Sequence, residues 1–289
     1  MDLQTSIYLS TILQSQNYIL ASLVVFWFYD CILTLDQEVS LIHWSQWKKG
    51  STFYIMARYM PAFMLSVHLC MNYLRSEDFV TCNLLHLIWF CAAGLCIAGA
   101  EGIFVLRTYG LWGQKKFILG LMLSTIVCLV TLDVIIQTVL SQSGLQLLVS
   151  DMGGGCYTLS HDTTAAYDWS LLVVFDLEII VLTMIRVYWE YRERRYLLLD
   201  ILLQHNIFYF GTGLALSVIN LLLIARLPFN SSNMFATFQV VMHTILVTRM
   251  HLQFCNTSQV CHSSESEFST VSDFQLTQIE LQTRSDSNA

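Results

Sequence analysis

The stretch Tyr29–Pro61, YDCILTLDQEVSLIHWSQWKKGSTFYIMARYMP, decides the fold class of this 289-residue chain. It joins the end of one apolar segment to the start of another through a short loop that contains Lys48 and Lys49. Asp30 and Arg58 place one acidic and one basic side chain inside these two segments. Charged side chains inside a hydrocarbon core are costly and usually pair with one another. The stretch therefore predicts two neighbouring membrane helices joined by a basic loop.

The composition of the whole chain is that of an integral membrane protein. Hydrophobic residues make up 55% of the sequence, charged residues only 12%, and the mean hydropathy is +0.56. A soluble domain carries about 25% charged residues. The net charge is -7 and no basic patch interrupts the sequence, so we expect no nucleic-acid partner. The expected partners are the lipid bilayer and an unidentified ligand or cytosolic signalling protein.

Seven apolar segments of 19 to 25 residues run along the chain. A helix of about 20 residues crosses the hydrocarbon core, and a helix satisfies its backbone groups within one segment. The sequence therefore predicts an all-α fold, an integral membrane bundle of seven transmembrane helices within residues 17–254. The predicted spans are 17–35, 52–74, 82–106, 117–140, 166–188, 201–225 and 234–253.

The two ends of the chain are predicted to lie outside the bundle. Residues 1–16 contain no Lys or Arg and do not have the pattern of a signal peptide, so we interpret them as a short outer N-terminus. Residues 255–289 are acidic and rich in Ser, Thr and Gln, which predicts a disordered tail.

The distribution of basic residues predicts the orientation of the bundle. Positive residues favour the cytoplasmic side of a membrane. Only Arg75 and Arg226 fall on one side of the predicted spans, and the other twelve of the fourteen fall on the opposite side. These twelve are Lys48, Lys49, Arg58, Arg107, Lys115, Lys116, Arg186, Arg192, Arg194, Arg195, Arg249 and Arg284. The N-terminus is therefore predicted outside and the C-terminal tail in the cytosol, at the plasma membrane or an endomembrane.

The run YD-x4-LDQEVSLIHWSQW-x5-FYIMARYMP resembles the N-terminal signature of a large fungal family of seven-helix membrane proteins of unknown function, DUF6533. The stretches RTYGLWGQKK, FDLEIIVLTMIRVYWEYR and LVTRMHLQF are also similar to it, so the resemblance extends to about residue 254. It departs at Gln204-His205-Asn206, where an Arg-Asp-Gly-like step is expected. The resemblance implies a fold and a membrane location, and no activity.

Two covalent features are predicted on the outer face. Cys82 opens the third span, and Cys156 lies in the outer loop 141–165. Disulfides persist in oxidising compartments, so we predict a Cys82–Cys156 bridge, with two free thiols as the alternative. Asn230-Ser231-Ser232 is a candidate glycosylation site before the last span.

Several charged or small residues are predicted to have structural roles. Asp30 and Arg58 come to the same depth at 1.5 Å per residue, which predicts an ion pair between the first two spans. Glu101 is expected near the inner edge together with Arg107. The spacing Gly94-x3-Ala98-x3-Gly102 predicts a small-residue face for close helix packing.

Two polar groups could carry chemistry. His68, His86 and Asp133 reach a similar depth and form a candidate zinc site, although interfacial histidines bonded to the backbone remain the preferred interpretation. Asp176, Glu178 and His243 lie near the midplane as a candidate polar pocket. Residues two apart face different sides of a helix, so at most one of the two acids is expected to face a given cavity. We expect no bound metal and no cofactor.

Absent motifs exclude two familiar classes of seven-helix protein. A retinal protein needs a lysine in the last span, yet the only lysines are 48, 49, 115 and 116. The acid-Arg-Tyr triplet and Asn-Pro-x-x-Tyr motif of rhodopsin-like receptors are missing. Three hypotheses remain: a receptor-like or sensor protein, ranked first and not an enzyme; a polar-solute or proton-coupled transporter using Asp176, Glu178 and His243; and an intramembrane metal-dependent hydrolase using His68, His86 and Asp133.

Overall fold

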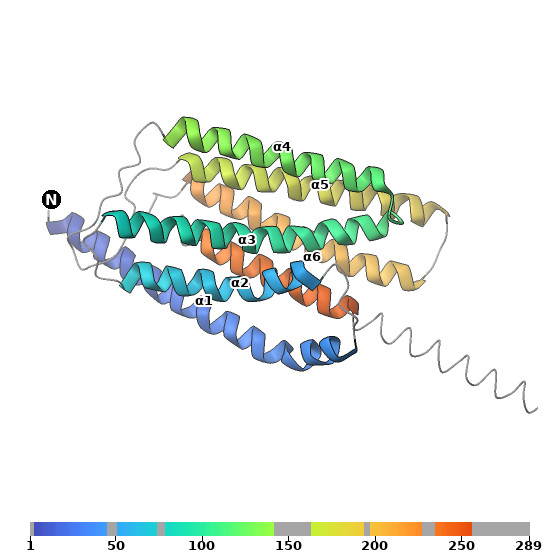
Figure 1. Cartoon of the computed structure of the whole chain (residues 1–289), viewed down its shortest axis with the longest axis horizontal. Coiled ribbons are helices and arrows are strands. Elements are labelled where there is room, and N and C mark those ends of the chain that lie inside the picture. The colour runs from blue at the N-terminus through green and yellow to red at the C-terminus, as the bar shows by residue number, and fades with distance from the viewer. Residues whose placement is uncertain are drawn as a thin grey trace, which may run out of the picture.

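The computed structural model describes residues 3–44, 51–73, 79–141, 163–193, 197–226 and 235–255, and these form seven α-helices with no strand among them (Figure 1). The helices are α1 (Leu3–Trp44), α2 (Ser51–Tyr73), α3 (Phe79–Leu111), α4 (Lys116–Ser141), α5 (Thr163–Glu193), α6 (Leu197–Arg226) and a C-terminal helix, residues 235–255. The predicted all-α fold is confirmed. Each predicted span falls on one of these helices, and α1 already begins at Leu3, within the predicted N-terminal segment.

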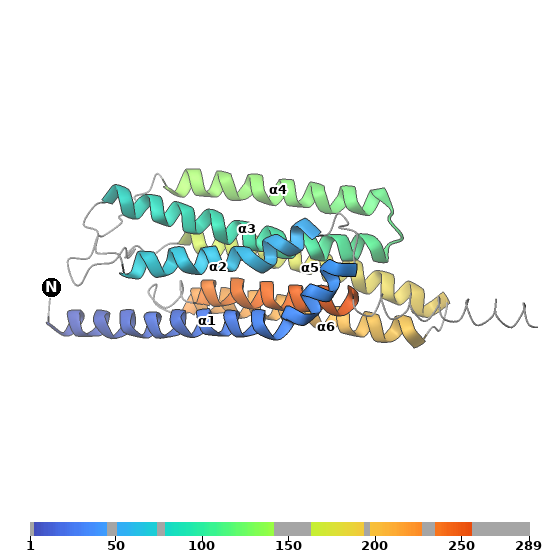
Figure 2. The same ribbon diagram turned by 60° about the horizontal axis from the view of Figure 1, so that its bottom comes forward.

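The helices lie side by side along the long axis of the molecule and alternate in direction (Figures 1 and 2). The α1 to α2, α3 to α4 and α5 to α6 connections join helix ends that lie at the same end of the bundle. Helix α2 packs mainly against α3, and α5 mainly against α6. The C-terminal helix, orange to red in Figure 2, makes side-chain contacts with α1, α2, α3 and α6, which places it in the interior of the bundle.

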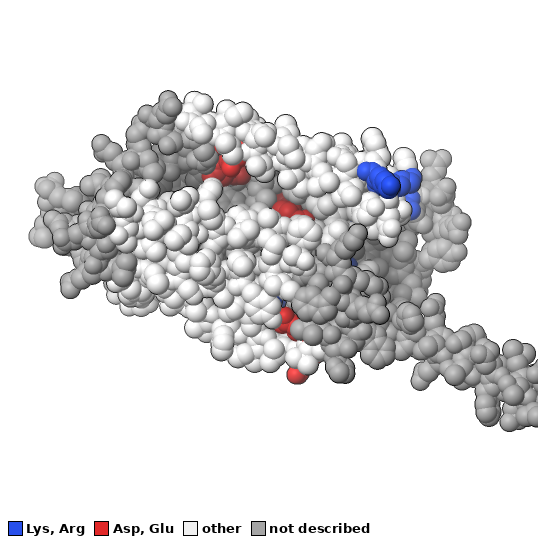
Figure 3. All heavy atoms as spheres, viewed as in Figure 1, with Lys and Arg blue, Asp and Glu red and all other residues white. Residues whose placement is uncertain are grey.

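Three of the described helical segments are long and apolar enough to cross a membrane: Gln14–Val39, Val80–Leu111 and Lys116–Ile136. Their outward side chains are apolar, as Val25 on α1 and Phe117 and Val127 on α4 illustrate. The visible side in Figure 3 is formed largely of uncharged residues, with basic atoms gathered near the turn between α3 and α4. An apolar surface of this extent needs a hydrophobic surrounding. The orientation in the membrane stays a prediction.

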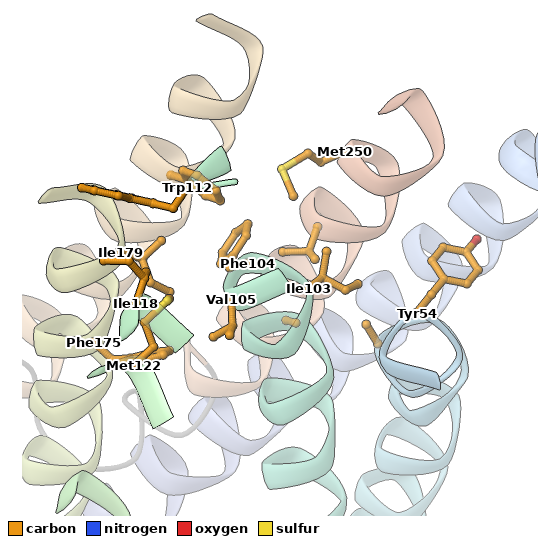
Figure 4. Packing of buried hydrophobic residues seen from close by; sticks show 14 of the residues in the cluster. Tyr54, Ile103, Phe104, Val105, Trp112, Ile118, Met122, Phe175, Ile179 and Met250 are labelled. Atoms are coloured by element: carbon orange, nitrogen blue, oxygen red, sulfur yellow. The ribbon is translucent and has the colours of Figure 1, made fainter. Parts of the chain in front are cut away.

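The main hydrophobic cluster packs around α3 (Figure 4). Ile103, Phe104 and Val105 of α3 are buried together with Phe175 of α5 and Met250 of the C-terminal helix. Because consecutive helical residues point in different directions, burial at 103, 104 and 105 means that α3 is covered on most sides at this level.

The close contact between α2 and α3 is made by glycines that differ in part from the predicted small-residue face. A Cβ on Gly99 would lie 2.7 Å from the backbone nitrogen of Ala57, and one on Gly102 would lie 2.2 Å from the Phe53 ring. A Cβ on Gly94 would meet nothing within 4 Å, and Ala98 is exposed. The predicted face is therefore wrong except at Gly102, since the α2 contact follows Gly99 and Gly102 around the helix.

A glycine ends α3 and sets the turn into α4. Gly113 has φ +64°, its backbone N–H donates to Gly110, and the N–H of Gln114 donates to the carbonyl of Tyr109. This pattern is a Schellman cap, in which the left-handed residue is usually glycine. Arg186 of α5 donates its Nε–H to the carbonyl of Leu111 at 3.0 Å. A side chain from α5 thus binds one of the last carbonyls of α3 and completes the hydrogen bonding at this helix end.

Some sequence predictions fall on residues outside the described ranges. Cys82 is disulfide-bonded and buried, but Cys156 lies outside these ranges, so the pairing with Cys156 stays a prediction. The same holds for Lys48, Lys49 and Asn230 and for the tail beyond Cys255. The departure Gln204-His205-Asn206 lies within α6.

Candidate functional site

The first of two buried polar groups is the arginine–carboxylate cluster, which we define as Asp30, Glu38, Arg58 and Arg249. Arg58 Nη1 lies 2.7 Å from Asp30 Oδ2, and Arg249 Nε lies 2.6 Å from Asp30 Oδ1. Arg58 Nε lies 3.5 Å from Glu38 Oε2, and Tyr59 donates its hydroxyl to Glu38 Oε1 at 2.7 Å. The structure therefore brings the predicted Asp30–Arg58 pair together and adds two partners that the sequence did not indicate.

This cluster balances its own charge. It contains two carboxylates and two guanidinium groups, and Asp30, Glu38 and Arg58 are each at least 95% buried. Arg58 also donates to the Thr34 hydroxyl, which in turn donates to the Asp30 carbonyl. Buried ions are tolerated when they are paired and hydrogen-bonded. The arrangement indicates a structural clamp that joins α1, α2 and the C-terminal helix.

The second group is the acid–histidine cluster, defined as Glu101, Asp176, Ser217, Gln239 and His243. His243 Nε2 lies 3.1 Å from Glu101 Oε1. Ser217 donates to Asp176 Oδ2 at 2.8 Å, and the Gln239 side-chain amide donates to the Ser217 hydroxyl at 2.8 Å. One ligand atom each of Glu101, Asp176 and His243 lies within 4.8 Å of the other two. All five side chains are buried.

Four helices position the acid–histidine cluster. Glu101 comes from α3, Asp176 from α5, Ser217 from α6, and Gln239 and His243 from one face of the C-terminal helix, since residues four apart are neighbours on a helix.

The histidine side chain at the centre of this cluster has a fixed place. A Cβ on Gly213 of α6 would lie 3.3 Å from the His243 ring, so the glycine leaves room for the imidazole. The Phe104 ring lies edge-on to the imidazole at 5.4 Å and to Phe210 at 4.6 Å. These neighbours hold the imidazole beside Glu101.

Charge in the acid–histidine cluster is not balanced by basic residues. Among the described residues, no Lys or Arg lies within ion-pair distance of Glu101 or Asp176. Two buried polar atoms of the cluster also lack a hydrogen-bond partner among the described residues, namely His243 Nδ1 and Gln239 Oε1. Buried polar groups normally have partners, so unpartnered ones call for a ligand, an ion or water.

Of the predicted midplane residues, the structure brings Asp176 and His243 together and separates Glu178 from them. Glu178 Oε1 accepts a hydrogen bond from Thr125 of α4 at 3.1 Å, on another side of α5. The expected division between residues two apart on a helix explains this. Glu101 takes the place of the second acid. Its depth was misjudged because α3, at 33 residues, is longer than a bilayer core requires, so its apolar limits do not fix its height.

The sequence candidate for a zinc site is wrong in its residues. His68 and His86 both contact the Trp89 ring, with centroid distances of 5.6 Å and 5.9 Å, and His68 Nδ1 lies 3.3 Å from the Thr237 hydroxyl. Within the described ranges, the one trio of potential metal ligands that converges is Glu101, Asp176 and His243. A shared depth does not specify which way side chains face, so Asp133 does not join the two histidines.

Arg107 was expected beside Glu101 but contacts the end of the C-terminal helix. Its Nη2 donates to the carbonyls of Met250 and His251 at 3.3 Å and 3.4 Å, and the guanidinium lies 3.9 Å above the Phe254 ring. These carbonyls lie near the C-terminal end of the helix, so the guanidinium charge complements the helix dipole.

The comparisons with known proteins concern the part of the chain that carries most of the arginine–carboxylate cluster. Residues 18–63 match a family of unknown function, DUF6533, which confirms the resemblance over that stretch. No curated protein and no solved structure matches the chain. Asp30, Glu38 and Arg58 lie inside the matched residues, whereas Arg249 and the acid–histidine cluster lie beyond them. Over residues 18–63 the chain is therefore similar to the DUF6533 family of unknown function.

Proposed function

We propose that this chain is a receptor-like or sensor membrane protein of seven spans, with the N-terminus outside and the tail in the cytosol. In this proposal the C-terminal helix relays changes at the acid–histidine cluster to the arginine–carboxylate cluster. One observation carries it: both clusters have a member on the same buried helix, His243 in one and Arg249 in the other. Six residues of helix separate them by about 9 Å.

The geometry favours transmission of a change from His243 to Asp30, because the C-terminal helix that connects them is rigid and the Arg249–Asp30 contact at its end can change. Arg249 is 39% exposed and holds Asp30 from one side, whereas Arg58 holds it from the other side and is almost fully buried. A shift or rotation of the helix at His243 would therefore loosen or tighten the Arg249–Asp30 contact and leave the Asp30–Arg58 pair in place. Two discrete arrangements of a buried ionic contact are the kind of element on which switching depends.

The relay is tested at Cys31, a free and partly buried thiol next to Asp30. We expect His243→Gln to change the rate at which N-ethylmaleimide modifies Cys31 by about threefold or more, measured residue by residue with mass spectrometry on the full chain in lipid nanodiscs. Glu178→Gln is the matched control, because Glu178 lies on α5 outside the cluster. Cys91, a free exposed thiol on α3, is the internal reference.

A second test uses the free energy of unfolding of His243→Gln, Asp30→Asn and the double variant. Independent sites give additive changes within about 0.3–0.5 kcal/mol. The relay predicts a larger coupling energy. Additive stabilities together with an unchanged Cys31 rate in His243→Gln would refute it.

A proton-coupled carrier is the second candidate, and the acid–histidine cluster favours it because ionisable groups inside a bundle are common in ion pathways. The test measures proton flux with a pH-sensitive dye in sealed vesicles that contain the full chain. Flux above that of empty vesicles, lost in Asp176→Asn and kept in Glu178→Gln, would favour the carrier. The hydrolase hypothesis based on His68, His86 and Asp133 has no support in the geometry of those residues.

A further inference from the structure

Three side chains that are potential metal ligands converge at one buried point. This arrangement suggests metal binding, which the proposed relay does not require. We propose that Glu101, Asp176 and His243 bind one divalent transition-metal ion, with Zn²⁺ as the reference ion. The three side chains come from α3, α5 and the C-terminal helix and are 6%, 4% and 3% exposed. An ion held by them would tie these helices together in the interior of the bundle.

The distances fit such an ion with small adjustments. Zinc lies about 2.0–2.2 Å from imidazole nitrogen and carboxylate oxygen, so two ligands of a tetrahedral ion lie about 3.4 Å apart. His243 Nε2 and Glu101 Oε1 are already 3.1 Å apart. The remaining separations are at most 4.8 Å, and side-chain rotations would bring Asp176 to its position. Three protein ligands leave the fourth position of a tetrahedron open.

The charge of the site also fits a dication. Two carboxylates with a neutral imidazole carry a charge of -2, which an ion of charge +2 neutralises. The arginine–carboxylate cluster shows the alternative solution in the same protein, since two arginines neutralise its two acids. At Glu101 and Asp176 no described arginine or lysine does this. An isolated charge costs much more inside a bundle than in water, so a counter-ion is the fitting partner.

Surrounding polar groups resemble the outer shell of a metal site. Metal-bound carboxylates are usually held by further hydrogen bonds, as Ser217 holds Asp176 while Gln239 donates to Ser217. Glu101 accepts no hydrogen bond from a hydroxyl, amide or backbone group in the described part of the chain, so its oxygens are available as ligands. Gln239 Oε1 is buried and has no hydrogen-bond partner among the described residues, so this polar group can accept a further hydrogen bond.

The ligand set selects the class of ion. One imidazole with two carboxylates suits Zn²⁺, Mn²⁺, Fe²⁺ or Co²⁺. Ca²⁺ takes six to eight oxygen ligands and Mg²⁺ prefers to keep its waters, so neither fits three protein ligands that include an imidazole. We expect Zn²⁺ to bind more tightly than Mn²⁺, following the general order of affinities, and Ca²⁺ to have no effect.

The test uses the full chain in lipid nanodiscs, stripped with a chelator and then titrated with Zn²⁺, Mn²⁺ or Ca²⁺. We expect about one zinc per chain by elemental analysis and a rise in unfolding temperature with zinc, because an ion that binds only the folded state stabilises it. His243→Gln, Asp176→Asn and Glu101→Gln should each weaken zinc binding at least about tenfold. His68→Gln and Glu178→Gln should bind zinc as the parent does.

Two results would overturn the proposal. One is a stripped parent chain that takes up no zinc and does not change its unfolding temperature. The other is equal zinc binding in the parent and in His243→Gln and Asp176→Asn, which would place the ion elsewhere. Size-exclusion profiles and circular dichroism identify any variant that fails to fold, and three separate ligand variants keep the test decisive. The proposal does not rest on the relay, whose Cys31 readout is measured on the metal-free chain.

Discussion

At the scale of single residues, charge inside the bundle is handled in two different ways. Asp30 is held between two arginines at 2.7 Å and 2.6 Å, and the cluster around it is neutral. Among the described residues, Glu101 and Asp176 have one imidazole near them and no arginine or lysine within ion-pair distance. Removing one partner from the first cluster therefore leaves a buried charge uncompensated, whereas removing an acid from the second relieves repulsion and costs a ligand.

We predict that Asp30→Asn destabilises the protein by about 3–5 kcal/mol, the usual cost of breaking a buried ion pair from one side. The reason is that Arg58, 2% exposed, would keep its charge and lose its closest acceptor. The free energy of unfolding in nanodiscs measures this. Asp36→Asn is the matched control, because Asp36 lies on the same helix and is exposed. Equal stabilities for the two variants would contradict the clamp.

We also predict that Gly213→Ala is less stable than Gly211→Ala by about 1–3 kcal/mol, as is usual for overpacking. A Cβ at 213 would lie 3.3 Å from the His243 ring, whereas one at 211 would meet no atom within 4 Å. Both variants change α6 by the same methyl group, so the difference isolates the contact. Thermal unfolding of the two variants measures it, and indistinguishable curves would show that the imidazole moves freely aside.

The sequence predicted a contact between two residues correctly where their depth in the bundle was enough to bring them together. Asp30 and Arg58 lie on helices that are consecutive in sequence, so equal depth made contact easy to foresee. Glu38 and Arg249 were missed because pairing across the bundle depends on how each helix is rotated, which hydropathy does not report. Glu101 was missed for the related reason that a long helix can slide along its axis without exposing polar residues.

At the scale of elements, α3 and the C-terminal helix organise the bundle. Helix α3 contacts α2 through glycines and α5 through its apolar side chains, and Arg107 near its end donates to carbonyls of the C-terminal helix. The C-terminal helix in turn has many buried polar side chains, such as Thr237, Gln239 and Thr248. This polarity explains why it is not among the three described segments that are long and apolar enough to cross a membrane.

We predict that Gly99→Ala destabilises the α2–α3 contact by about 1–3 kcal/mol or more, because the new methyl group would meet the backbone nitrogen of Ala57 at 2.7 Å. Backbone atoms cannot rotate away, so the helices must separate. Unfolding of the full chain measures the loss. Gly94→Ala on the same helix adds its methyl group to open space and should leave stability unchanged within about 0.5 kcal/mol. A loss of the same size in both variants would contradict the close contact at Gly99, because alanine is the better helix former and the methyl group at 94 meets no neighbour.

The sequence predicts where helices lie along the chain better than it predicts which face of a helix packs against a neighbour. The seven apolar segments anticipated the seven described helices, since a helix is the structure that buries its own backbone groups in lipid. The small-residue spacing of four pointed to Gly94 and Ala98, yet α2 packs at Gly99 and Gly102. The spacing of small residues identifies a face of a helix, but it does not show whether a neighbouring helix or lipid covers that face.

At the scale of the whole molecule, apolar side chains face outward and polar clusters lie inside. Exposed Val, Leu and Phe side chains run along α1 and α4, while the buried acids, arginines and hydroxyls lie between the helices together with the apolar core. A soluble helical bundle has the opposite distribution. This distribution was foreseeable from composition, because a sequence with 12% charged residues cannot coat such a bundle with polar groups.

We predict that the C-terminal tail, residues 256–289, is cleaved by protease only when the protease reaches the cytosolic side of sealed vesicles. The positive-inside bias is the physical reason. Mass spectrometry of the tail peptides before and after permeabilisation measures it. Tail cleavage in intact right-side-out vesicles would reverse the proposed orientation, while cleavage of an N-terminal epitope tag in the same vesicles serves as the positive control.

The Arg249–Asp30 contact also bears on the order in which the protein is made. Asp30 leaves the ribosome 219 residues before its second arginine, so the newly made α1 and α2 contain only three members of the cluster, Asp30, Glu38 and Arg58, with a net charge of -1. The deficit lasts until the last helix arrives. The arrival of Arg249 thus neutralises the excess negative charge of residues near the start of the chain. A chain that stops short of residue 249 would keep an unpaired acid that cellular quality control can recognise.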